Sequence, residues 1–191
     1  MGGVIAREFD PPALYNRVLG ADFDQLPQAV RILHDLTAPT VWTGRVDVYR
    51  GGSRLARLAG RLMGLPPAGY GMPLHVTFTP DGRGGETWVR MFGPTPFRSL
   101  MRQAGAHVAE RVGLMTLHYR ATASETALAQ EVFKVTLLGV PLPALARPTV
   151  TSREFEVDGD YRFEVTVLLP GIGPLVRYEG RLVRSRADPL V

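Results

Sequence analysis

Arg90 is a charged residue in an otherwise largely apolar, aromatic pattern, and its chemistry is that of an anchor for an oxygen atom. Four residues at alternate positions share one side of a predicted strand: Glu86, Trp88, Arg90 and Phe92. If the two aromatic side chains face the interior, Arg90 does so as well. Its planar guanidinium could then bind a carboxylate, enolate or tetronate-like oxygen. We predict Arg90 as a catalytic residue, with Trp88 and Phe92 in a ligand-binding wall.

A structural ion pair is the competing interpretation of Arg90. An unpaired buried charge is strongly unfavourable, so a buried arginine needs either a carboxylate partner or an anionic ligand. The sequence offers Glu86, Glu110 and Glu154 as partners and does not choose among them.

Two tyrosines supply the other polar groups of the predicted interior. Tyr161 shares a strand face with Phe163 and Val165, and the adjoining strand places Tyr178 beside Val176. In a cavity, the two phenol groups would orient an apolar ligand, whereas in a filled core they would bond to the backbone. We predict Tyr161 and Tyr178 as catalytic residues and Phe163, Val165 and Val176 as ligand-binding residues.

The remaining titratable residues indicate no metal site, and we expect no cofactor. The four histidines lack the spacing of metal ligands, and His34, at the end of a predicted helix, is expected to cap or pack. Glu154 and Glu156 share a strand face and are a conceivable acid–base pair. Because Phe155 and Val157 form the apolar face of that strand, we expect both glutamates to be solvated.

The elements that must position these residues are mostly strands. Residues 1–40 predict a helical segment, 41–183 an antiparallel sheet with one inserted helix at 53–63, and 184–191 a tail. Residues 139–143 predict a loop that cannot continue a ladder. The fold class is α+β in a single domain, 1–191: a strongly curved antiparallel sheet or β-barrel, lipocalin-like or helix-grip-like, with two or three N-terminal helices packed on one side.

The inserted helix is amphipathic and basic. Its apolar stripe is Leu55, Leu58, Ala59 and Leu62, and Arg54, Arg57 and Arg61 occupy the other face. We expect the stripe to dock on the barrel. Binding to an anionic membrane surface is possible in principle but not favoured. The following Pro/Gly-rich segment, with Leu65 and Met72, is a candidate lid over a cavity.

Composition excludes several classes of function. The chain has 191 residues, a net charge of +4 and no cysteine, which rules out disulfides and thiolate catalysis. Lys134 is the only lysine beside many arginines, which is typical of a high-GC, actinobacterial coding bias rather than of nucleic-acid binding. No apolar run is long enough for a membrane span and no signal peptide is evident, so we expect a cytoplasmic protein. The oligomeric state stays open.

An ordered set of motifs resembles a bacterial family of domains of unknown function. The family occurs alone or C-terminal to saccharopine-dehydrogenase-like reductase modules. The similarity extends over about residues 14–183 and rests on these segments: Gly64–Gly69, Trp88–Gly93, Phe97–Ser99, Glu110–Gly113, Gly139–Pro143, Glu154 ahead of Asp158-Gly159, Tyr161–Val165 and Leu175–Gly180. The resemblance implies no established activity. No G-x-G-x-x-G follows a strand, so nucleotide binding is not inferred.

Together these patterns predict a barrel that binds an apolar small molecule of polyketide, lipid or isoprenoid type. One version is a cofactor-free cyclase or isomerase of natural-product biosynthesis, which folds its substrate in a shaped cavity. The alternative is a non-catalytic accessory module that binds a reductase partner or a membrane surface. The first predicts a void of roughly several hundred Å³ lined by Trp88, Phe163 and Tyr178. The second predicts a filled barrel and an exposed apolar patch on the helical side.

Overall fold

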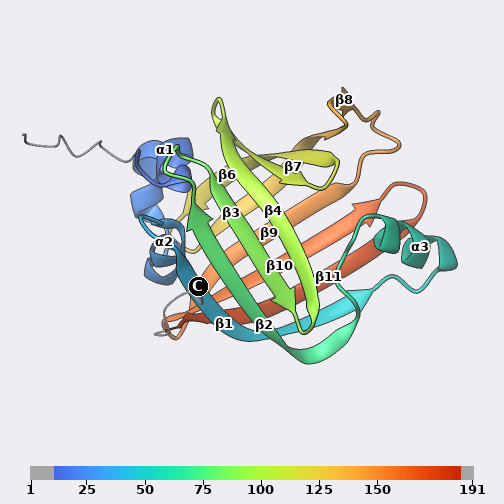
Figure 1. Ribbon diagram of the computed structural model, residues 1–191, viewed down its shortest axis with the longest axis horizontal. Helices are drawn as coiled ribbons and strands as arrows, with labels where there is room; N and C mark the ends of the chain where they lie inside the picture. Colours follow the sequence, from blue (N-terminus) through green and yellow to red (C-terminus); the bar gives the residue numbers. More distant parts are fainter. Residues whose placement is uncertain (1–10, 186–191) are drawn as a thin grey trace, which may run out of the picture.

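Ten antiparallel strands close into a β-barrel in the computed structural model, which describes residues 11–185 (Figure 1). Around the barrel the order is β6-β5-β4-β3-β2-β1-β11-β10-β9-β7, and pairing of β7 with β6 completes the ring. The strands are β1 Thr40–Arg50, β2 Gly69–Pro80, β3 Glu86–Phe92, β4 Thr95–Ala104, β5 His107–Val112, β6 Met115–Ser124, β7 Ala127–Leu137, β9 Thr149–Val157, β10 Asp160–Leu169 and β11 Gly173–Arg184. The predicted α+β barrel is confirmed.

A short additional strand corrects the prediction of a loop at 139–143. Strand β8, Val140–Pro141, pairs with the end of β7 outside the closed ring. Leu137 pairs with Val140 and Thr136 with Pro141. A proline is tolerated here because β8 lies at an edge and its missing N–H interrupts no inner ladder.

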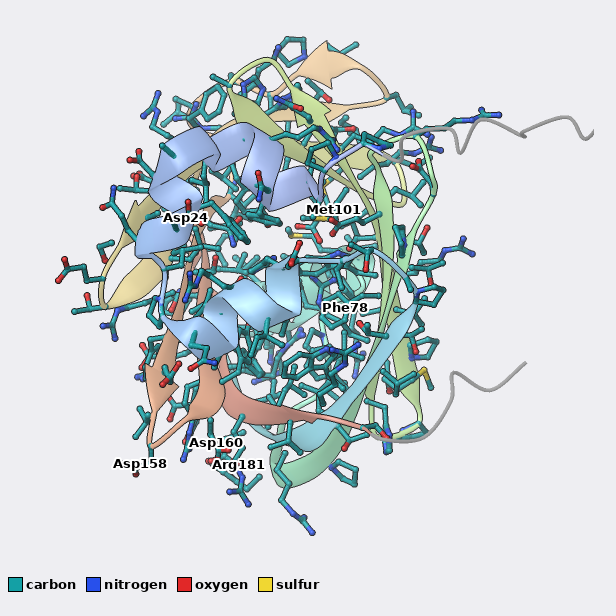
Figure 2. The ribbon with its side chains drawn as sticks, turned by 90° about the vertical axis from the view of Figure 1, so that its left-hand side faces the viewer. Asp24, Phe78, Met101, Asp158, Asp160 and Arg181 are labelled. Carbon is teal, nitrogen blue, oxygen red and sulfur yellow. The ribbon has the colours of Figure 1, made fainter. Side chains whose placement is uncertain are left out.

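Three short helices close one end of the barrel. They are α1 Leu14–Leu19, the 3-10 helix η1 Gly20–Gln25 and α2 Gln28–His34, and Figure 2 looks onto this end with the helices in front of the strands. Each helix is too short to be stable alone, and each buries an apolar face against the barrel. Tyr15, Val30 and Leu33 are fully buried there.

Barrel carboxylates complete the N-termini of α1 and α2. Neither Ala13 nor Pro27, the residues that precede these helices, offers a capping side chain. Glu86 of β3 accepts a hydrogen bond from Leu14 N at 3.3 Å, and Glu156 of β9 accepts one from Ala29 N at 2.7 Å. The unpaired N–H groups of a helix start and its positive dipole end both favour a carboxylate.

The face assignment of β9 is a correction. Glu154 and Glu156, predicted to be solvated, point inward at the end of the barrel that the helices cover, and Glu154 is only 5% exposed. Phe155 lies on the outer wall, where the Arg153 guanidinium covers its ring at 4.5 Å. The apolar side of this strand therefore faces out, because the helices supply the interior carboxylates with polar partners.

The other end of the barrel carries the inserted helix α3, Arg54–Leu62 (Figure 1). Its predicted docking face is wrong. Leu55, Leu58 and Leu62 are 62%, 55% and 82% exposed, whereas Ala56 and Gly60 are buried. The small residues let the helix backbone approach the barrel, and Gly60 packs against the guanidinium of Arg50.

No helix within residues 11–185 combines the length and the apolar character needed to cross a membrane.

Two glycines allow the close approach of β1 and β11. Gly44 pairs with Leu182, and Gly180 pairs with Val46. A Cβ atom at Gly44 would collide with the backbone carbonyl of Arg181, and one at Gly180 with that of Arg45. Glycine at such positions allows the close backbone approach that barrel coiling requires.

We expect Gly44→Ala to destabilise the fold by about 1–3 kcal/mol, because backbone cannot move aside as a flexible side chain can. Gly52→Ala is the matched control, since a Cβ there meets no atom. Denaturant unfolding of both variants tests the claim, and equal stability of the two would show that the close approach of the strands does not require glycine.

Candidate functional site

A cavity of about 130 Å³ lies inside the barrel. Its wall is mainly apolar, and Tyr15 from α1 closes it toward the helices. Trp88, Phe163 and Tyr178 line it as predicted, but the volume is smaller than the several hundred Å³ expected. A void of this size matches engineered apolar cavities that hold one aromatic ring.

Most of the residues predicted to form a site come together here. Cavity-lining positions from the prediction are Arg90, Tyr161, Tyr178, Trp88, Phe92, Phe163 and Val165. Val176 is the exception. It is fully buried in the core next to the β10–β11 turn and does not line the cavity. Alternation places a residue on the interior face of a strand but does not say at which depth the interior is hollow.

Arg90 faces the cavity and has a carboxylate partner. Its Nη1 donates to Ser99 Oγ at 2.9 Å and lies 3.5 Å from Glu110 Oε1. Of the three acids that the sequence offered, Glu110 is therefore the partner. The side chain keeps 16% of its surface accessible, and Nε and Nη2 have no hydrogen bond to any described residue. Burial acts to lower the pKa of Arg90, but Glu110 and the neighbouring tyrosines together outweigh it and the pKa is raised, so the charge persists.

Tyr119 provides a hydrogen-bond donor for the second carboxylate oxygen of Glu110. Its hydroxyl donates to Glu110 Oε2 at 2.7 Å. Burial and the neighbouring carboxylate hold the pKa of Tyr119 well above its ordinary value, so it stays a donor. Arg90, Glu110 and Tyr119 thus form a neutralised polar cluster on the β3–β6 wall.

A second buried cluster joins the opposite wall to the helices. His34 Nε2 lies 2.6 Å from Glu154 Oε2, while Gln130 donates to Glu154 Oε1 at 3.0 Å. Tyr15 donates to Gln130 at 2.9 Å, and the hydroxyl of Tyr161 is also hydrogen-bonded to Glu154. His34 therefore packs in the core, as predicted, but its carboxylate partner was not foreseen.

Glu154 stays ionised although it is deeply buried. Burial acts to raise the pKa of its carboxyl, but the charge of His34 and the hydrogen bonds from His34 and Tyr161 outweigh that effect, and the pKa is lowered. Glu86 differs, since burial raises its pKa despite the hydrogen bond from Trp88 Nε1 at 2.8 Å. Within residues 11–185, no three acidic or histidine side chains are grouped closely enough to hold a metal ion.

Besides Arg90, Tyr178 presents at the cavity wall a polar group that the protein leaves unengaged. Its ring packs edge-on against Phe92 with centroids 5.6 Å apart, and its hydroxyl has no hydrogen-bond partner among the described residues. Burial raises the pKa of Tyr178 to about 12, so the phenol is protonated and able to donate at neutral pH. Tyr161 differs, because Glu154 already engages its hydroxyl.

The segment after α3 lines the outer part of the cavity. Met63, Leu65 and Pro66 contribute to its wall, while Met72, the other proposed lid residue, does not. Arg50 holds this segment by donating to the carbonyls of Leu65 and Pro66 at 3.1 and 3.0 Å.

Fold and site together define a helix-closed antiparallel β-barrel with an apolar cavity and two buried polar clusters. The chain belongs to the family described as domain of unknown function DUF4166, whose model matches residues 26–182. No curated protein matches the sequence. The association of the family with reductase modules stays a prediction.

Removing the charge of Glu154 should cost stability in a pH-dependent way. Because the pKa of this carboxyl is lowered in the folded protein, its contribution is present above the ordinary value of 4.5 and is lost as the pH falls below it. We expect Glu154→Gln to reduce the free energy of unfolding by about 3 kcal/mol at neutral pH, and by progressively less as the pH falls below 4.5.

Denaturant unfolding across this pH range measures the difference between the two proteins. The control is Glu131→Gln, which removes an exposed carboxylate from the neighbouring strand β7. A wild-type minus Glu154→Gln difference that stays constant with pH would contradict the assigned ion pair.

Proposed function

We propose that the protein binds an apolar small molecule that carries a neutral oxygen group, a carbonyl above all, inside the barrel. The observation that carries this proposal is a pair of unengaged donors in a largely apolar cavity: the hydroxyl of Tyr178 and the free N–H groups of Arg90. Buried donors are normally satisfied, so donors that face a cavity without a protein partner favour an acceptor on a ligand.

A neutral oxygen fits the cavity better than an anion. Arg90 is already paired with Glu110, and Glu154 on the opposite wall is already paired with His34. An anionic ligand would therefore bring a second negative group beside the one guanidinium of Arg90. A carbonyl would accept hydrogen bonds from Arg90 and Tyr178 without disturbing the charge balance.

The apolar portion of the ligand would lie against the aromatic wall formed by Trp88, Phe92 and Phe163. The present volume accommodates about one ring. A larger polyketide, lipid or isoprenoid would require outward movement of the segment with Met63, Leu65 and Pro66. These three cavity-lining residues all belong to the connection between β1 and β2.

The reaction class that this arrangement would serve is cofactor-free cyclisation or isomerisation. In such a reaction no atom enters or leaves the substrate. Arg90 and Tyr178 would stabilise charge that develops on the carbonyl oxygen, and the apolar wall would hold the chain in a folded conformation. The alternative of a purely accessory module predicts a filled barrel, so the cavity supports the ligand-binding proposal over it.

A matched pair of probes tests the donors directly. Acetophenone and ethylbenzene have similar shapes and differ in the carbonyl oxygen. We expect acetophenone to bind more tightly, and Tyr178→Phe to weaken acetophenone by roughly fivefold while leaving ethylbenzene unchanged, because one hydrogen bond contributes about 1 kcal/mol. Ligand-observed NMR titration measures both affinities.

Tyr70→Phe is the control, since Tyr70 is an exposed phenol outside the cavity. Failure of both probes to bind, or an equal effect of Tyr178→Phe on the two probes, would contradict the proposal.

A further inference from the structure

The open end of the barrel exposes an unusual amount of apolar surface. We define the mouth rim as the connections at this end: residues 51–68, 93–94, 113–114, 138–148 and 170–172. Within residues 11–185, seven of the fourteen exposed large apolar side chains lie in these connections. The helical end, residues 11–39, 81–85, 105–106, 125–126 and 158–159, contributes one, Ile32. Apolar exposure concentrated at one end of a molecule is typical of an interaction surface.

The exposed apolar groups form two ridges that flank the mouth. One is the outer face of α3, with Leu55, Leu58 and Leu62. The other is the connection around β8, where Leu138 N donates to the carbonyl of Leu114 at 2.9 Å and joins two turns. Figure 1 shows α3 and β8 at the same end of the barrel, opposite α1 and α2. Leu145, at 86% exposed, extends the second ridge.

The two ends of the barrel also differ in charge. The mouth rim contains four arginines and no aspartate or glutamate within its described residues. The helical end contains six acidic residues against three arginines within its own. Figure 2 shows Asp24 and Asp158 at that helical end. Two outer-wall acids on β1 and β11 are engaged, since Asp47 accepts from Gly71 N and Glu179 pairs with Arg177 at 2.6 Å.

Helix α3 places leucines and arginines on the same outward side. Arg54, Arg57 and Arg61 are exposed next to the leucine stripe, and the buried face is formed by Ala56 and Gly60 instead. Leucines with flanking arginines match a helix that inserts its apolar face among acyl chains while its guanidinium groups reach the lipid phosphates.

We propose that the mouth rim docks on the surface of an anionic lipid bilayer. A second copy meeting mouth to mouth would bring arginines against arginines, with no acid in either rim to pair them. An anionic bilayer supplies acyl chains for the apolar side chains of the rim and negative charge for its arginines. Docking does not require a ligand. If the proposed function also holds, the cavity mouth would face the lipid, and an apolar substrate could enter from the bilayer without crossing water.

Vesicle co-sedimentation of the whole chain tests the docking. The vesicles are phosphatidylcholine alone and phosphatidylcholine mixed with phosphatidylglycerol. We expect binding to the anionic vesicles, weakened by added salt because the charge interaction is screened. Leu58→Glu with Leu62→Glu, and separately Arg54→Glu with Arg61→Glu, should each weaken binding at least about tenfold.

Matched variants at the helical end, or on the strand residues next to it, serve as controls. Ile32→Glu with Val157→Glu changes two exposed apolar residues, and Arg83→Glu with Arg102→Glu reverses two exposed arginines. Both should bind as the wild type does. All substituted side chains are on the surface, so we expect each variant to fold. Circular dichroism and unfolding curves check this.

Three results would overturn the docking proposal: no binding to anionic vesicles, equal loss in rim and control variants, or a rim-dependent dimer in sedimentation velocity. The last would identify a second copy as the occupant. The probe titration with Tyr178→Phe reports on the cavity alone, so failure of docking and failure of ligand binding are distinguishable.

Discussion

The pairing of buried carboxylates with the helical segment is the interaction on which the rest of the structure depends. Glu154 meets His34, and Glu86 and Glu156 accept the N–H groups that begin α1 and α2. An unpaired carboxylate in a barrel interior would be strongly destabilising, and helices of this length do not form alone. Each partner therefore makes the other possible, and the barrel is closed at one end by polar contacts as well as by apolar packing.

This closure determines the end of the barrel from which the cavity can be reached. Because α1 and α2 close one end, the remaining route to the interior lies at the end of α3. The polar groups follow the same axis: Glu154 and Tyr161 near the helices are fully engaged with the protein, whereas Arg90 and Tyr178 keep donors for a ligand. The apolar and basic mouth rim lies beyond them. A ligand would thus pass from an apolar entrance to hydrogen-bond donors that the protein itself leaves unused.

The sequence predicted what alternation controls and failed where distant partners decide. The inward side of β3 and β10 follows from Trp88 and Phe163, and it places Arg90 and Tyr161 correctly. On β9 the same rule gave the wrong face, because Glu154 is buried by a histidine 120 residues away. Nothing local marks that pairing. The leucines of α3 also led to a wrong prediction, because an apolar stripe does not specify which surface it contacts. Gly60, a small residue, lies on the face that docks on the barrel. The depth and volume of the cavity depend on packing among many strands, which periodicity does not specify.

The most direct test of the ligand-binding account is native mass spectrometry of gently purified protein, followed by organic extraction. We expect an apolar, oxygen-bearing species that accompanies the folded protein and leaves it on denaturation. A clean mass of the chain alone, unchanged after incubation with a broad panel of lipids and polyketides, would contradict the account.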